Sequence, residues 1–166
     1  MNTIIVEGGK DMGDRIYPIG IQNFEKIRKE GYVYVDKTAL MYKLVKSGSY
    51  YFLSRPRRFG KSLLISTLEA YFEAKRDLFE GLAVETLEKD WVKRPVFHLD
   101  LNIGKYDTPD SLDKILNETL DYWESLYGTR SAETTLALRF AGVVGRAYEQ
   151  SGEPVSYTHL TLPTSD

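Results

Sequence analysis

The chain has 166 residues, with 22 Lys and Arg against 24 Asp and Glu, so its formal charge is −2. It contains no Cys and only two His, which excludes a disulfide framework, a thiolate zinc site and a cysteine nucleophile, and argues against a histidine-rich metal centre. With 42% hydrophobic and 28% charged residues, the composition is typical of a globular domain. No apolar run approaches the roughly 20 residues of a membrane span and no signal-peptide core is present. We therefore expect a cytoplasmic protein without membrane partners.

The first third of the chain predicts a flexible arm followed by alternating short elements. Residues 1–14 contain three Gly and one short apolar cluster, which is typical of a loose N-terminal arm. Apolar spacing then predicts a short helix over residues 23–29, and a β-branched and aromatic run predicts a strand over residues 32–35. A helix is predicted over residues 36–46, with Asp36 as its N-cap.

The rest of the chain continues the alternation of strands and helices. Residues 50–53, Tyr-Tyr-Phe-Leu, predict a buried strand, and residues 61–73 predict a helix whose apolar stripe packs against a sheet. A second core strand is predicted over residues 95–101, and two further helices over residues 108–127 and 131–150. Strands separated by helices favour a parallel sheet in a three-layer α/β fold.

The most informative segment is a basic loop between the strand predicted over residues 50–53 and the helix that follows it. Three Arg and Lys61 fall within residues 55–61, where they repel one another unless an anion or solvent neutralises them. Gly60–Ser62 matches the second half of the phosphate-binding pattern GxxxxGK[ST]. In that pattern backbone N–H groups surround the phosphates, Lys reaches the β and γ oxygens and the hydroxyl holds Mg²⁺. Arg55 stands at the position of the first glycine, so the match is partial.

The basic loop has two other interpretations. It could be a solvated turn that joins a strand to a helix and binds nothing. Its cations could also contact nucleic-acid phosphates, with some of the 12 Tyr and 7 Phe as stacking faces. Most of those aromatic residues lie at core-like positions, however, and a chain of net negative charge lacks the basic footprint of a dedicated nucleic-acid-binding protein. A nucleotide is therefore the favoured partner, and nucleic acid remains the alternative.

Three sequence blocks together resemble a known family. Pro18–Arg28 reads PIGIQNFEKIR, Tyr34–Thr38 reads YVDKT and Arg55–Ser62 reads RPRRFGKS. In this order and spacing they resemble the bacterial AAA-ATPase-like family, whose full-length members usually carry a C-terminal PD-(D/E)XK nuclease-like domain. The resemblance spans residues 16–153, and Arg replaces the first loop glycine in that family too. It implies a P-loop NTPase fold, Mg-ATP as the ligand and ATP hydrolysis by the full-length protein.

The resemblance also implies which residues bind the nucleotide. Lys61 would be the catalytic residue on the β and γ phosphates, and Ser62 the Mg²⁺ ligand. Asp36 and Lys37 lie where related ATPases place a helix that flanks the base, which implies an adenine-side role. The full set of expected binding residues comprises Arg57, Arg58, Phe59, Gly60, Lys61, Ser62 and Leu63.

The acid that orients Mg²⁺ for hydrolysis has one early candidate, Asp100, which follows a four-residue apolar run and could equally be an ordinary strand-end residue. In similar proteins an apolar strand that ends in Asp-Glu begins just after the position of Glu153. Here residues 155–166 read VSYTHLTLPTSD, which resembles translated adapter sequence. We interpret them as a non-native tail that should be excluded from the fold. A genuine short strand over residues 156–162 is the alternative.

These observations predict an incomplete P-loop domain. Residues 15–154 would form the N-terminal part of an AAA-ATPase-like domain with a three-layer α/β/α architecture. The chain would be truncated before the Walker B strand, the strand that ends in Asp-Glu in similar proteins. Such a fragment would bind Mg-ATP and hydrolyse it poorly. The alternative is a truncation that does not fold, because missing strands leave a sheet edge and apolar helix faces unpaired. The sequence contains no indication of an oligomeric state.

Overall fold

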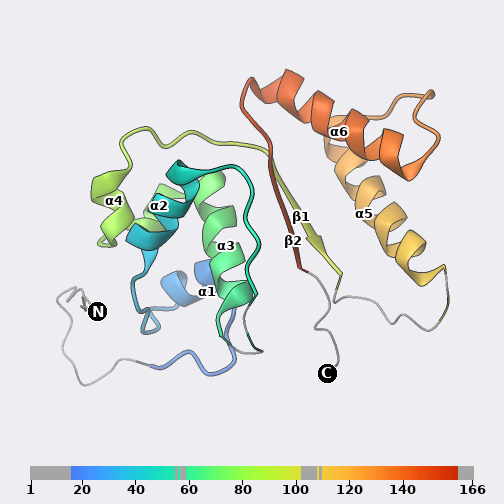
Figure 1. The fold of residues 1–166 in the computed structure, drawn as a ribbon. Helices are drawn as coiled ribbons and strands as arrows, with labels where there is room; N and C mark the ends of the chain where they lie inside the picture. Colours follow the sequence, from blue (N-terminus) through green and yellow to red (C-terminus); the bar gives the residue numbers. More distant parts are fainter. Residues whose placement is uncertain (1–15, 55, 57–58, 102–107, 109, 161–166) are drawn as a thin grey trace. The chain divides into compact units, whose positions relative to one another are not determined.

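A computed structural model describes the backbone of residues 16–54, 56, 59–101, 108 and 110–160, and the side chains of this set up to Tyr157. The chain divides into an N-terminal unit, Met1–Val92, and a C-terminal unit, Lys93–Asp166 (Figure 1). The elements of the N-terminal unit are α1 (Phe24–Lys29), α2 (Thr38–Ser47), α3 (Lys61–Phe72), the 3-10 helix η1 (Arg76–Phe79) and α4 (Ala83–Leu87). Those of the C-terminal unit are β1 (Val96–Asp100), α5 (Ser111–Tyr127), α6 (Leu136–Ser151) and β2 (Ser156–Leu160).

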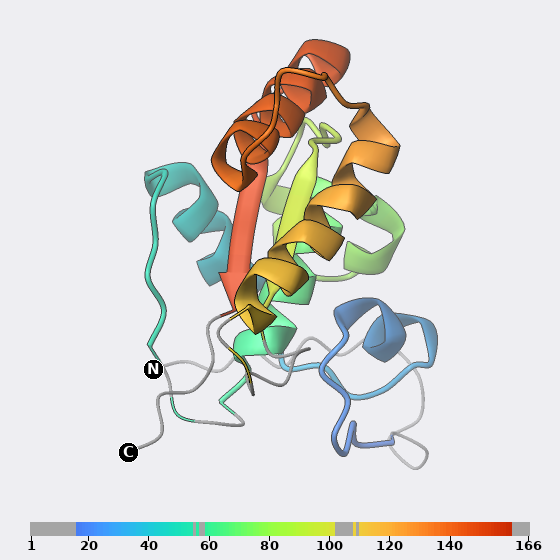
Figure 2. The same cartoon turned by 90° about the vertical axis from the view of Figure 1, so that its right-hand side faces the viewer.

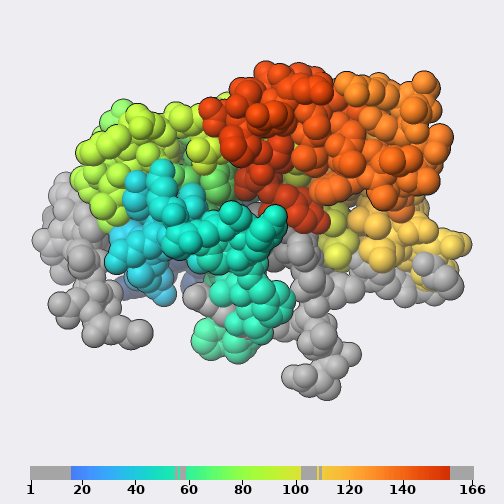
Figure 3. Space-filling model, turned by 45° about the horizontal axis from the view of Figure 1, so that its top comes forward, coloured from blue at the N-terminus to red at the C-terminus, as the bar shows by residue number. Residues whose placement is uncertain are grey.

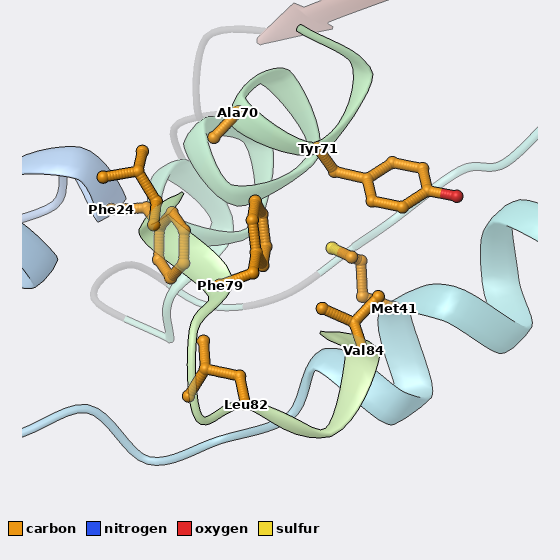
Figure 4. Packing of buried hydrophobic residues seen from close by; sticks show 8 residues of the cluster. Phe24, Met41, Ala70, Tyr71, Phe79, Leu82 and Val84 are labelled. Atoms are coloured by element: carbon orange, nitrogen blue, oxygen red, sulfur yellow. The ribbon is translucent and has the colours of Figure 1, made fainter. Parts of the chain in front are cut away.

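The core of the N-terminal unit is a cluster of aromatic and aliphatic side chains from all of its helices (Figure 4). Phe24 of α1 and Phe79 of η1 are completely buried, and their ring centroids lie 4.9 Å apart. Tyr71 of α3 contacts Phe79 edge-on. The helix predicted over residues 61–73 is thus confirmed as α3, but its buried side packs among helices, whereas the sequence predicted a sheet.

Both strands predicted for the N-terminal unit are wrong in this structure. Residues 32–35 and 50–53 adopt no regular secondary structure. Tyr50 is 97% exposed and Phe52 89% exposed, and Figure 3 shows the teal part of the chain that contains them at the surface. A strand is stabilised by hydrogen bonds to a neighbouring strand, and the described residues of this unit form no strand that could be such a neighbour. The hydrophobicity of residues 50–53 therefore predicted their burial incorrectly.

The C-terminal unit is a strand, two helices and a second strand. β1 pairs with β2 in parallel, in a register that runs from Val96 opposite Ser156 to Asp100 opposite Leu160. In Figures 1 and 2, α5 and α6 lie on one face of this two-stranded sheet. Phe97 and Leu99 are the buried residues of β1, because alternate side chains of a strand point to the same face. The structure confirms a mixed α/β fold with a parallel sheet, in a chain that is mostly helical in its described part.

The two helices of the C-terminal unit match the predictions in type and differ in their boundaries. α5 ends where Gly128 was expected to stop it, with φ +86° at that glycine. α6 begins at Leu136, five residues after the predicted start, because the hydroxyl of Thr135 accepts a hydrogen bond from the backbone N–H of Leu138. The buried face of α6 contains Val143 and Ala147 as predicted.

An Arg–carboxylate cluster joins α5 to α6. The guanidinium of Arg139 donates to both carboxylate oxygens of Glu124, at 2.9 and 2.6 Å, and to Asp121 at 2.5 Å. The hydrogen bonds with Glu124, followed by the one with Asp121, raise the pKa of Arg139 despite its burial. The two helices are therefore held by charge-assisted bonds as well as by the apolar core.

β2 lies inside the segment that the sequence analysis excluded from the fold. Residues 156–160 form a parallel strand on β1, and the backbone N–H of Ser156 donates to the carbonyl of Pro95 at 2.9 Å. The exclusion of this segment from the fold is therefore corrected, in favour of the alternative of a short strand. The non-native origin of residues 155–166 stays a prediction.

Candidate functional site

The start of α3 is formed by a glycine N-cap followed by a lysine and a serine. Gly60 has φ +76° and ψ 21°, a left-handed conformation, and its carbonyl accepts the first helical hydrogen bond, from Leu64 at 2.9 Å. Among the described residues, no atom would clash with a Cβ at this position, so the conformation rather than the space favours glycine. The first turn contains no acidic residue. The positive end of the helix dipole therefore lies at Lys61 and Ser62 without an adjoining carboxylate in that turn.

The structure places four of the expected binding residues together. Gly60, Lys61, Ser62 and Leu63 occupy the N-cap and first turn of α3, and the three helical residues are half-buried. Phe59 precedes them with an exposed ring. Arg55, Arg57 and Arg58 lie outside the described residues.

Ser66 ties α3 to the chain segment that precedes α1. Its hydroxyl oxygen accepts a hydrogen bond from the backbone N–H of Phe24 at 3.0 Å. The same hydroxyl lies 3.1 Å from the carbonyl of Gln22 and 3.0 Å from that of Leu63, to either of which it can donate its one proton. The PIGIQNFEKIR block is therefore attached to the helix that begins with Lys61. The sequence analysis missed Ser66, because its partners Gln22 and Phe24 lie more than 40 residues away and no local pattern indicates them.

The YVDKT block fastens α2 to the start of α4. One carboxylate oxygen of Asp36 accepts from the backbone N–H and the hydroxyl of Thr38, at 2.8 and 2.7 Å. The other accepts from the backbone N–H of Ala83 at 2.7 Å, and the hydroxyl oxygen of Thr38 accepts from that of Val84 at 3.1 Å. Asp36 is not the N-cap of α2, a position that Lys37 holds. Because both oxygens of Asp36 are engaged, this geometry supports a structural role for Asp36 over the expected adenine-side role.

Glu88 is the most buried carboxylate of the N-terminal unit among the described residues. It accepts hydrogen bonds from the hydroxyl of Tyr71 and from the backbone N–H groups of Lys89 and Asp90, and it pairs with Lys46 at 3.1 Å. Burial opposes its charge, but the bonds from Tyr71, Lys46 and Asp90 outweigh burial and hold its pKa below the ordinary value. Glu88 therefore stays ionised within a structural cluster.

The sequence offered Asp100 as one further site residue, in the C-terminal unit. Asp100 is the last residue of β1, as expected of a strand-end acid, and its role toward Mg²⁺ stays a prediction. Within the described ranges, no three His, Cys, Asp or Glu side chains gather closely enough to hold a metal ion. The helices described are too short or too polar to cross a membrane.

Comparison with protein families shows one match that spans most of the chain. Residues 18–157 match the AAA-ATPase-like family, which is described as a predicted AAA-ATPase. The chain is 38% identical over 146 residues to a protein of Azotobacter chroococcum mcd 1, described as an uncharacterized protein in the vnfD 5′ region. This match covers 87% of the chain and 28% of that relative. No solved structure matches the chain.

Proposed function

The chain belongs to the AAA-ATPase-like family, and we propose that it binds Mg-ATP at the start of α3. In this proposal the β and γ phosphates lie against the first turn of α3, and the ammonium of Lys61 binds their oxygens. The hydroxyl of Ser62 is a hard oxygen ligand of the kind that Mg²⁺ prefers, and the phosphates supply further oxygens. Gly60 and Leu63 contribute backbone N–H groups, and Arg57, Arg58 and Phe59 complete the loop.

The observation that carries the proposal is the left-handed Gly60 at the N-cap of α3, directly before Lys61 and Ser62. A glycine in this conformation lets backbone N–H groups turn toward an anion, and the helix dipole adds positive potential at the same point. A lysine and a hydroxyl in the first turn then match the chemistry of a nucleotide phosphate with its magnesium ion.

The finer architecture and the catalytic step belong to the same proposal. We infer that the whole protein has the three-layer P-loop fold, because its family is an ATPase family and the start of α3 fits a phosphate loop. Hydrolysis also requires an acid that orients Mg²⁺ and a group that polarises the attacking water. Asp100 is the candidate acid of this chain, and we expect the 166-residue chain to hydrolyse ATP slowly compared with the whole protein.

Calorimetric titration of Mg-ATP into wild type and the Lys61→Ala variant tests the proposal. We expect the variant to bind roughly ten- to a hundredfold more weakly, because it loses a charge-assisted hydrogen bond to phosphate. Lys43→Ala is the matched control, since Lys43 is an exposed lysine of α2, and its affinity should equal that of wild type. Equal affinity of the Lys61→Ala variant and wild type would contradict the proposal.

The alternative nucleic-acid partner is tested with a single-stranded oligonucleotide and no magnesium. Binding through several backbone phosphates would weaken by orders of magnitude between roughly 50 and 200 mM salt. We expect the chain to bind Mg-ATP more tightly than the oligonucleotide at both salt concentrations. The reverse order would favour the nucleic-acid function.

A further inference from the structure

Two side-chain hydroxyls of α3 lie near one carbonyl of its first turn, that of Leu63. The hydroxyl of Thr67 donates to this carbonyl at 2.7 Å, and that of Ser66 lies 3.0 Å from it. Thr67 is 2% exposed, so its bond is shielded from water. Ser66 is the weaker candidate, because its one proton can go to the carbonyl of Gln22 instead. Thr67 is therefore the principal side-chain donor to Leu63.

The bond from Thr67 begins a chain of hydrogen bonds that leads to the proposed phosphate site. The carbonyl of Leu63 shares its peptide group with the N–H of Leu64, which donates to the carbonyl of Gly60 at 2.9 Å. That carbonyl in turn shares its peptide group with the N–H of Lys61. Helical N–H groups point toward the N-terminus of their helix, so this last N–H points toward the place proposed for the phosphates.

The YVDKT block extends the chain at its other end. A side-chain hydrogen bond connects Tyr34 of this block to Thr67. Because the one proton of Thr67 goes to Leu63, the phenol of Tyr34 donates and the hydroxyl of Thr67 accepts. Burial is the main cause that raises the pKa of Tyr34 above its ordinary value, so the phenol keeps the proton that it donates. The YVDKT block is thus joined to the first turn of α3.

We propose that Thr67 is a positioning residue of the phosphate site, which strengthens the hydrogen bond from the N–H of Lys61 to phosphate. The inference rests on the proposed function of α3. A donor at one end of a hydrogen-bond chain polarises each peptide group along it, so the N–H at the other end becomes a better donor. The same bonds hold the carbonyl of the left-handed Gly60 in place. In this proposal Thr67 acts through the backbone and does not touch the nucleotide.

Titration of Mg-ATP into two variants of Thr67 separates this role from packing. Thr67→Val keeps the shape of the side chain and loses the hydroxyl, whereas Thr67→Ser keeps the hydroxyl and loses a methyl group. We expect the valine variant to bind Mg-ATP about two- to fourfold more weakly, and the serine variant to bind it as wild type does. A packing role predicts the opposite order, because serine leaves a cavity in the core. That order would overturn the inference.

Thr119→Val is the matched control. The hydroxyl of Thr119 donates to the carbonyl of Ile115 at 2.8 Å, which is the same bond from residue i to residue i−4, in a helix where no phosphate site is proposed. Its affinity for Mg-ATP should equal that of wild type. An equal loss of affinity in Thr119→Val and Thr67→Val would assign the effect to general stability and would overturn the inference.

Amide proton chemical shifts test the chain of hydrogen bonds itself, because an amide proton in a stronger hydrogen bond resonates further downfield. In the protein saturated with Mg-ATP, the signals of Leu64 and Lys61 should move upfield in Thr67→Val and return in Thr67→Ser. Unchanged signals in the valine variant would overturn the inference. If that variant does not fold, Tyr34→Phe replaces it and should move the same two signals upfield by a smaller amount, and unchanged signals would again overturn the inference.

The outcomes separate this inference from the proposed function. If Lys61→Ala weakens Mg-ATP binding while Thr67→Val binds as wild type does, the positioning role is wrong and the phosphate site stands. If Lys61→Ala binds as wild type does, the phosphate site itself is wrong.

Discussion

The starts of α3 and α6 differ in how each helix is closed. At α6 the hydroxyl of Thr135 accepts from the backbone N–H of Leu138, so the chain itself caps the helix. At α3 the N-cap is Gly60, which has no side chain, and the first turn has a lysine and no acid. Helices that serve packing alone gain stability from a polar cap. The difference teaches that a threonine of the chain itself caps α6, whereas the N-cap of α3 supplies no side-chain acceptor, and this is the helix start at which we propose an anion.

The largest effect on stability is expected at Gly142, where α6 packs closely against Glu133 of the loop before it. A Cβ at Gly142 would collide with the carboxylate of Glu133, which Arg146 holds by a hydrogen bond. Gly142→Ala should therefore push the Glu133 carboxylate out of its largely buried pair with Arg146 and lower the free energy of unfolding by about 2–3 kcal/mol. Urea denaturation measures this value.

Gly145→Ala is the matched control, because it lies in the same helix and a Cβ there would meet no described atom within 4 Å outside the backbone of that helix. It should gain about 0.5–1 kcal/mol from the higher helix propensity of alanine. Equal unfolding free energies of the two variants would show that Glu133 does not fit against Gly142.

The next effect tests the start of α4, which, like that of α6, is closed by side chains. Asp36→Ala removes the acceptor of three hydrogen bonds and leaves the backbone N–H groups of Thr38 and Ala83 without it. We expect about 2 kcal/mol of destabilisation and an unchanged affinity for Mg-ATP in the folded protein. A variant of normal stability that binds ATP more weakly would instead return Asp36 to the adenine side.

A smaller effect tests the cap of α6 directly. Thr135→Ala removes the hydroxyl that accepts from Leu138 and should cost about 1 kcal/mol, while Thr135→Ser should cost much less. Thermal unfolding at one fixed pH measures both. If alanine and serine give the same stability, the hydroxyl does not close this helix.

The smallest effect concerns α1, whose first turn contains an acid, unlike that of α3. Hydrogen bonds from Lys29 and then from Lys75 lower the pKa of Glu25 from 4.5 to about 2. Because the folded pKa lies below the unfolded one, the stabilisation is complete above pH 4.5 and is lost as the pH falls toward 2. Glu25 is one-third exposed, so solvent screening limits the loss to less than about 1 kcal/mol.

Urea denaturation at about pH 5 and about pH 2.5 checks this dependence in wild type and in Glu25→Gln. The variant should lose less stability than wild type between the two pH values. An equal loss in both proteins would assign the acid sensitivity to other carboxylates.

Helices could be predicted from the sequence where one apolar face is buried within its own unit. The spacing of Leu120 and Trp123 predicted α5, and the glycine that follows Tyr127 predicted its end. The strand over residues 50–53 could not be predicted correctly, because a strand depends on partners that lie elsewhere in the chain and periodicity does not reveal them. The start of α6 was misplaced because two nearby segments, at Ser131 and at Thr135, both offer cap residues.

The sequence correctly predicted that a helix begins at Lys61, but it did not reveal what the PIGIQNFEKIR and YVDKT blocks do. Asp36 and Thr38 look like site residues in a motif, yet their contacts reach Ala83 and Val84, more than 40 residues away. Ser66 bonds to Gln22 over a similar separation. Such long-range hydrogen bonds depend on tertiary structure, so local sequence patterns could not have indicated them.

The most direct test of the difference between α3 and α6 is an NMR titration of the isotope-labelled chain with Mg-ATP, observed through its backbone amides. We predict that the amide signals of Gly60, Lys61 and Ser62 shift as nucleotide binds, while those of Leu136 and Leu138 at the start of α6 stay in place. Unchanged signals at the start of α3, or equal shifts at both helix starts, would contradict the assignment of α3 as the phosphate-binding helix.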